Sequence, residues 1–146
     1  MTKAIRQDQA AGLRNLMPFQ VNNAARVFTI ASGKPRVGKT SVVVNLATAL
    51  AKNGKRVLLI DENPCHNNIC TNLGLQARFD LLHVINKDKQ LNQVLLQGPE
   101  NIAILSAMRG IHALCKLSSI EQDWLIKSFS ELTENVDIVL IDTAMT

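Results

Sequence analysis

The sequence predicts an α/β fold in which a parallel sheet carries helices on both faces. Two observations support this prediction: short apolar runs typical of buried strands alternate with segments of helical spacing, and two of those runs end in an aspartate. Such alternation is typical of parallel strands joined by helical crossovers. The length of 146 residues suits one domain, and 47% hydrophobic against 19% charged residues excludes a disordered chain.

Two strands around one helix form the first half of the predicted sheet. We expect buried strands at residues 27–31 and 56–60, the second ending at Asp61. Residues 41–52 between them predict a helix, because apolar side chains recur at three- and four-residue spacing until Gly54 stops the pattern.

Shorter elements are expected in the middle of the chain. A polar loop at residues 62–72 leads into two short helical patterns, at residues 81–86 and 91–96. A third strand is predicted at residues 102–105, after the helix-breaking pair Gly98-Pro99.

The last part of the chain predicts a helix followed by a strand. Ser118 and Glu121 have the spacing of a capping box, which marks the start of a helix. One face of that helix carries the apolar residues Leu125, Phe129 and Leu132. Residues 136–142 read as a final buried strand that ends in Asp142.

Eight residues between the first strand and its helix spell G-x-x-x-x-G-K-[ST]. They are Gly33, Lys34, Pro35, Arg36, Val37, Gly38, Lys39 and Thr40. Strand, glycine-bearing loop and helix form the setting of a phosphate-binding P-loop, because backbone N–H groups and the positive helix end face the phosphates. We therefore predict that these residues bind a nucleotide, with Lys39 on the β- and γ-phosphates and Thr40 on Mg²⁺.

Two strand-ending aspartates complete the predicted metal site. An apolar strand that ends in Asp142, after a P-loop, has the Walker B arrangement, in which the aspartate binds Mg²⁺ through a water. Asp61 ends its strand at the same edge and is expected to face the γ-phosphate; the alternative is a solvated loop carboxylate. Thr40, Asp61 and Asp142 are thus the candidate metal residues.

Residues 30–40 resemble the deviant Walker A loop of MinD/ParA-type ATPases, usually spelled S-G-K-G-G-V-G-K-T. Further similar segments are Asn45-Leu46-Ala47, residues 54–61, Asn72-Leu73-Gly74-Leu75 and Ile141-Asp142-Thr143-Ala144. The resemblance covers residues 25–146 and implies a P-loop NTPase fold, ATP with Mg²⁺, and a homodimer. It also implies that Lys34, matching the family's signature lysine, reaches the partner's phosphates as a catalytic residue.

Residues 1–24 form a predicted leader ahead of this domain. Asp8, Gln9, Ala10, Leu13 and Arg14 are similar to the D-Q-A-x-x-L-R leader of flagellar-number regulators of the FlhG/FleN type. The resemblance implies that residues 3–17 form a short helix that stimulates a signal-recognition-like GTPase. Ala10, Leu13 and Met17 do fall on one helical face, and Pro18 ends the run. The alternative is a frayed tail that binds nothing.

Three departures from the family pattern predict weak or absent hydrolysis. Pro35 and Arg36 replace glycines; the proline removes one backbone N–H, and the arginine adds bulk where the partner's lysine approaches. Asn63 stands where the family has an acid that positions the attacking water, and an amide cannot accept a proton from it. The family fold continues beyond Walker B, so we expect a partial domain that lacks the later strands and the C-terminal membrane helix.

Charge and composition limit the remaining functions. The net charge is +4, divided into +9 for residues 1–60 and −5 for residues 61–146. The basic residues are scattered with almost no aromatic neighbours, which disfavours direct nucleic-acid binding. Three cysteines without a pairing pattern predict reduced thiols in the cytoplasm, and Cys65, His66 and Cys70 lack a fourth metal ligand.

We expect an ATP-binding MinD/ParA-like switch of the flagellar type. The alternatives are a non-catalytic truncated relic that acts at most through its leader, and a ParA-type DNA-partitioning ATPase, which the D-Q-A leader disfavours.

Overall fold

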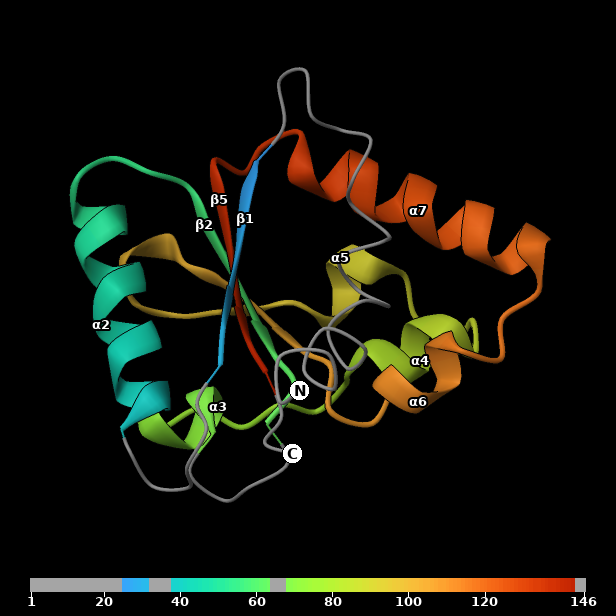
Figure 1. The fold of residues 1–146 in the computed structure, drawn as a ribbon, viewed down its shortest axis with the longest axis horizontal. Coiled ribbons are helices and arrows are strands. Elements are labelled where there is room, and N and C mark those ends of the chain that lie inside the picture. Colours follow the sequence, from blue (N-terminus) through green and yellow to red (C-terminus); the bar gives the residue numbers. More distant parts are fainter. Residues whose placement is uncertain (1–24, 32–37, 64–67, 144–146) are drawn as a thin grey trace.

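The computed structural model describes residues 25–31, 38–63 and 68–143, and these contain a five-stranded sheet (Figure 1). The strands are β1 (Arg26–Ile30), β2 (Val57–Asp61), β3 (Leu96–Gln97), β4 (Ala103–Ser106) and β5 (Ile138–Asp142). Their order across the sheet is β1-β5-β2-β4-β3. Neighbouring strands are parallel except at one edge, where β3 pairs antiparallel with β4.

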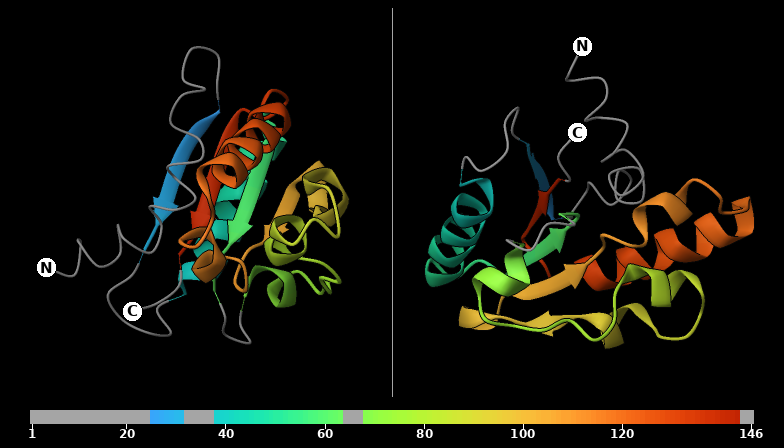
Figure 2. Two further views of the ribbon diagram at one scale, coloured as in Figure 1. Left: turned by 90° about the vertical axis from the view of Figure 1, so that its right-hand side faces the viewer. Right: turned by 90° about the horizontal axis from the view of Figure 1, so that it is seen from below.

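Helices cover both faces of this sheet, as the sequence predicts. The helical segments are α2 (Lys39–Lys52), α3 (Ile69–Asn72), α4 (Leu81–Ile85), α5 (Leu91–Val94), the 3₁₀ turn η1 (Pro99–Asn101), α6 (Ile111–Leu114) and α7 (Ser119–Thr133). Figure 2 shows α2 on one side of the sheet and α4, α6 and α7 on the other.

Alternating strand residues supply two separate cores. On the α2 side, Leu59 and Leu140 pack with Val43 and Ala47 of the helix. On the α7 side, neighbouring strand residues such as Leu58 pack against residues that include Leu125 and Phe129. All these side chains are buried, because successive strand residues point to opposite faces and both faces are covered.

The predicted main elements are confirmed with small shifts of their ends. The final strand begins at Ile138, and the first helix begins at Lys39, two residues before the predicted start. The capping box at the start of α7 is present: Ser118 Oγ accepts from the N–H of Glu121, and Glu121 Oε1 accepts from the N–H of Ser118, both at 3.3 Å.

Two local expectations are wrong. The loop predicted at residues 62–72 contains α3, because the Asn68 side chain accepts the Thr71 N–H at 2.9 Å and so caps a helical turn. The helical pattern at residues 91–96 ends at Val94, because Leu96 pairs with Ile104 in β3. The other strand pairs are parallel, so the predicted parallel sheet is confirmed with one short antiparallel strand added at its edge.

Across the described ranges, no helix is long and apolar enough to cross a membrane. The predicted leader at residues 1–24 and the loop residues 32–37 lie outside those ranges.

Candidate functional site

The candidate site lies where β1, β5 and β2 end side by side. Cα pairing sets Ile30 opposite Asp142 and Asp142 opposite Asp61, so both strand-ending aspartates meet at one edge of the sheet. Helix α2 begins at the same edge, directly after Gly38. Gly38 has φ of 77°, a left-handed conformation that favours glycine because other residues are strained there. The chain thus brings the start of a helix against two carboxylates.

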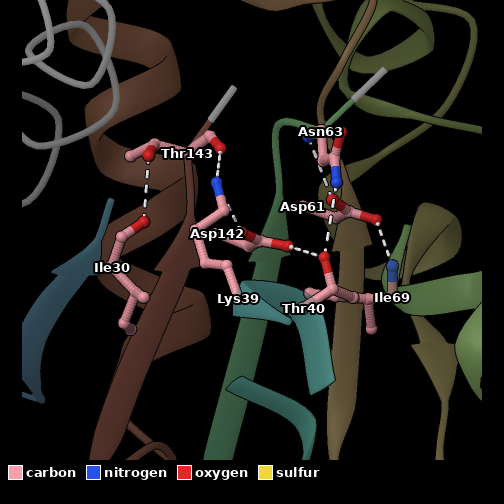
Figure 3. A network of polar contacts seen from close by, with 8 residues as sticks. All are labelled: Ile30, Lys39, Thr40, Asp61, Asn63, Ile69, Asp142 and Thr143. Carbon is pink, nitrogen blue, oxygen red and sulfur yellow. Dashed lines mark hydrogen bonds and ion pairs between the residues drawn. The ribbon is translucent and has the colours of Figure 1, made fainter. Parts of the chain in front are cut away.

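Lys39 and Asp142 form a buried ion pair at this edge. The Lys39 ammonium lies 3.0 Å from Asp142 Oδ1, and Asp142 is fully buried. The same ammonium donates a hydrogen bond to the backbone carbonyl of Thr143 (Figure 3). A buried charge is tolerated only when it is paired and hydrogen-bonded, and Lys39 meets both conditions through the end of β5.

Thr40 joins the same carboxylate from the next position of α2. Its hydroxyl donates to Asp142 Oδ2 at 2.9 Å, and it accepts a hydrogen bond from the Asn63 amide at 3.3 Å. Asn63, predicted at the position of the family acid, therefore lies inside the site and contacts a predicted metal residue. Its approach to Thr40 depends on a long-range contact that sequence spacing does not specify.

Asp61 is buried and holds the backbone beyond β2. Its two carboxylate oxygens accept the N–H groups of Asn63 and Ile69, each at 3.0 Å. Burial raises the pKa of Asp61 to about 6; Asp142 adds to the rise, while the two backbone hydrogen bonds oppose it. The alternative of a solvated loop carboxylate is wrong, because Asp61 has no exposed surface. Its role as a metal residue stays a prediction.

Thr143 anchors the chain just after β5 and was not among the predicted site residues. Its hydroxyl donates to the carbonyl of Ile30 at 2.9 Å, and its N–H donates to the same carbonyl at 3.2 Å. These bonds tie the last residue of β1 to the residue whose own carbonyl receives Lys39 (Figure 3). Its position directly after a strand-ending aspartate is the signal that could have identified it.

The described part of the predicted site therefore comes together as one cluster. It contains Lys39, Thr40, Asp61, Asn63 and Asp142. The remaining loop residues, Gly33 to Val37 with Lys34 among them, lie outside the described residues, as do Cys65 and His66. Within the described ranges, no group of three His, Cys, Asp or Glu side chains could hold a metal ion by itself.

The donor set of the cluster fits a magnesium-bound polyphosphate. Hydroxyl and carboxylate oxygens are ligands that Mg²⁺ prefers, often through water, and Thr40 and Asp142 present both. Lys39 brings a positive charge to the start of a 14-residue helix, whose N-terminal end attracts anions. This arrangement on a largely parallel α/β sheet defines the P-loop nucleoside triphosphate-binding class.

Comparisons with known proteins narrow that class. The AAA_31 family model, described as an AAA domain, matches residues 25–146. The antiactivator FleN of Pseudomonas aeruginosa is 40% identical over 119 residues, which cover 82% of this chain and 42% of FleN. A chain of the MinC:MinD cell division protein complex of Aquifex aeolicus is 28% identical with a TM-score of 0.64, over 83% of this chain and 48% of that one.

A more distant structure shares the fold. Cobyrinic acid a,c-diamide synthase from Mycobacterium smegmatis, solved with an ATP analogue and magnesium, has a TM-score of 0.66 at 24% identity, over 82% of this chain and 51% of that one. The chain thus belongs to the AAA_31 family, in its MinD/ParA group, and resembles FleN. The chain spans 42% of the length of FleN.

Proposed function

We propose that this chain is an ATP-binding switch protein and that Mg-ATP binds at residues 33–40. The observation that carries the proposal is the contact of Lys39 and Thr40 with one buried carboxylate, Asp142. In this assignment Lys39 binds the β- and γ-phosphates, and Thr40 and Asp142 hold Mg²⁺. Bound Mg-ATP would supply the phosphoanhydride bond for hydrolysis and the negative phosphate charge that Lys39 would contact.

Lys39 connects nucleotide binding to the end of β5. Its ammonium is held by Asp142 and by the Thr143 carbonyl, so phosphate oxygens compete with both for the same three N–H donors. Thr143 is in turn bonded to Ile30 at the end of β1. A change in the partners of Lys39 would therefore affect Thr143, which follows β5, and through it Ile30, the last residue of β1.

We propose that hydrolysis by this chain is slow or absent. Asn63 touches Thr40 and can orient a water, but its amide cannot take the proton that a carboxylate would accept. The same proposal includes Lys34, which would act on the nucleotide of the partner in a homodimer. Pro35 and Arg36 replace glycines beside this lysine and would hinder its approach.

Calorimetric titration of Mg-ATP tests the binding assignment. Lys39→Ala should weaken binding strongly, because the variant loses the only ammonium in the described cluster. The matched control is Lys52→Ala, an exposed lysine in the last turn of the same helix, which should bind like the wild type. Equal affinity for the wild type and Lys39→Ala would refute the assignment.

The finer role that we propose is regulation of the number and placement of flagella. We propose that the protein acts in the cytoplasm. The 40% identity to FleN supports it, and so do the leader residues Asp8, Gln9, Ala10, Leu13 and Arg14. In this proposal residues 3–17 bind and stimulate a signal-recognition-like flagellar GTPase, folding into a helix as they dock.

A synthetic peptide of residues 1–20 tests the leader separately from the nucleotide. It should raise the GTPase rate of the cognate partner, and Leu13→Asp should abolish the effect by placing a charge in an apolar groove. Asn15→Asp adds the same charge on the opposite side of the predicted helix and should leave the stimulation intact. If the peptide stimulates the GTPase but the full chain does not bind ATP, the result would favour the relic alternative. If the peptide does not stimulate the GTPase, the proposed GTPase partner would be refuted.

A further inference from the structure

A cleft separate from the nucleotide site lies against the N-terminal part of α7. It has a volume of about 420 Å³ and is lined by residues 87–90, Gln93, Ile120, Glu121 and Trp124. Helix α7 lies on the opposite face of the sheet from α2, so the cleft is separated from the start of α2 by the sheet itself (Figure 1). None of its lining residues takes part in the candidate nucleotide site.

Two large apolar side chains face solvent at this cleft. Ile120 is 81% exposed and Trp124 is 37% exposed, and they are one helical turn apart on α7. Single exposed apolar residues are ordinary, but a tryptophan and an isoleucine beside one hollow form an anchor site for another apolar side chain. The surface therefore fits an amphipathic segment.

The chain itself has such a segment within reach. Arg26 donates its N–H to the Asp137 carbonyl at 3.0 Å, so β1 starts beside the chain that follows the end of α7 at Thr133. Helix α7 has 15 residues and is about 22 Å long. Residues 18–24 of the leader, when fully extended, span about 23 Å, which is long enough for residues 3–17 to reach the cleft.

Charge and pattern match the leader to α7. The leader carries three basic residues against one acid: Lys3, Arg6 and Arg14 against Asp8. Helix α7 carries three acids against one base: Glu121, Asp123 and Glu131 against Lys127. The cleft lining itself carries two lysines, Lys87 and Lys89, and two acids, Asp88 and Glu121, so the acidic excess lies along α7 and not in the cleft. Lys89 lies over the Phe79 ring at 4.6 Å. An apolar face of Leu13 and Met17 with basic neighbours thus fits an apolar cleft on an acidic helix.

We propose that the leader of this chain docks in the cleft between α5 and α7 of its own domain, with Leu13 and Met17 against Ile120 and Trp124. The contact hides the apolar face of the leader until an outside partner competes for it. Docking therefore lowers the apparent affinity of the leader for any outside partner. This effect does not depend on nucleotide binding.

Trp124 reports directly on this contact, because it is the only tryptophan in the sequence. In the full chain, Leu13→Asp should shift the Trp124 emission to longer wavelength and increase its quenching by acrylamide, since the indole becomes more exposed. Asn15→Asp, with the same added charge on the opposite side of the predicted helix, should match the wild type. The peptide of residues 1–20, added to the Leu13→Asp chain, should restore the shorter wavelength.

A second variant tests the cleft side of the contact. Ile120→Asp should reproduce the exposure of Trp124, and the fold should survive because that side chain is largely exposed already. Identical emission and quenching for the wild type and Leu13→Asp would overturn the proposal. A red shift in Asn15→Asp as large as in Leu13→Asp would also overturn it. A wild-type signal that changes with protein concentration would assign the contact to a second copy and overturn docking within one chain.

Discussion

Replacing Asp142 with asparagine isolates the buried charge at the centre of the site. Asp142 is fully buried and pairs with Lys39 at 3.0 Å, and Lys39 is only 8% exposed. Removing one partner of a buried ion pair costs about 3–5 kcal/mol, because the other charge is left uncompensated. We expect the lower end, about 3 kcal/mol, because Lys39 keeps the Thr143 carbonyl and the asparagine oxygen can still accept from Thr40.

A double-mutant cycle with Lys39→Met measures the coupling between the two residues. Lys39→Met leaves Asp142 buried beside Asp61 and should cost about as much as Asp142→Asn, roughly 3 kcal/mol. The double variant has neither charge, so its loss should fall about 2 kcal/mol or more short of the sum of the single losses. Urea unfolding, followed by circular dichroism, gives each free energy.

The exposed pair of Arg56 and Asp137 is the control for this cycle. Its charges are 2.9 Å apart but reach solvent, so the same two kinds of substitution there should give a much smaller coupling. Additive losses at Lys39 and Asp142, within about 0.5 kcal/mol, would refute the buried ion pair as described.

Two further predictions concern Asn63 and Asp61. Asn63→Asp should raise the rate of ATP hydrolysis by about 10²-fold or more in a phosphate-release assay. The control Asn45→Asp, on the exposed face of α2, should leave the rate unchanged. Equal rates for the wild type and Asn63→Asp would refute the role of Asn63. Asp61 has a pKa of about 6 in the folded state, against an ordinary value of 3.8 in the unfolded chain, so between those two pH values the folded state binds a proton that the unfolded state has lost. Stability should therefore fall by about 3 kcal/mol as pH rises from about 4 to 6, and Asp61→Asn should lose that slope in urea unfolding. An unchanged slope in the variant would refute the pKa assignment.

Periodicity and strand-ending residues predicted most of what positions the site. The strands that end at Asp61 and Asp142 are fully buried, so continuous apolar runs identified them without an alternating pattern. The capping box at Ser118 specified the start of α7 because its hydrogen bonds are local.

Elements that depend on distant contacts could not be predicted in this way. β3 has two residues and exists because Leu96 and Gln97 pair with β4, and α3 has four residues, too few for a periodic pattern. Within the site, the Lys39 bond to the Thr143 carbonyl joins residues 104 positions apart.

The magnesium dependence of ATP affinity tests the central claim most directly. Calorimetric titration with ATP alone and with Mg-ATP should show tighter binding with magnesium for the wild type, because Thr40 and Asp142 present oxygens to the ion. Thr40→Ala should lose that gain. Thr48→Ala, which removes a hydroxyl bonded within α2 to the Val44 carbonyl, should keep it. A magnesium gain that is the same in the wild type and in Thr40→Ala would contradict the assignment of this edge of the sheet as the Mg-ATP site.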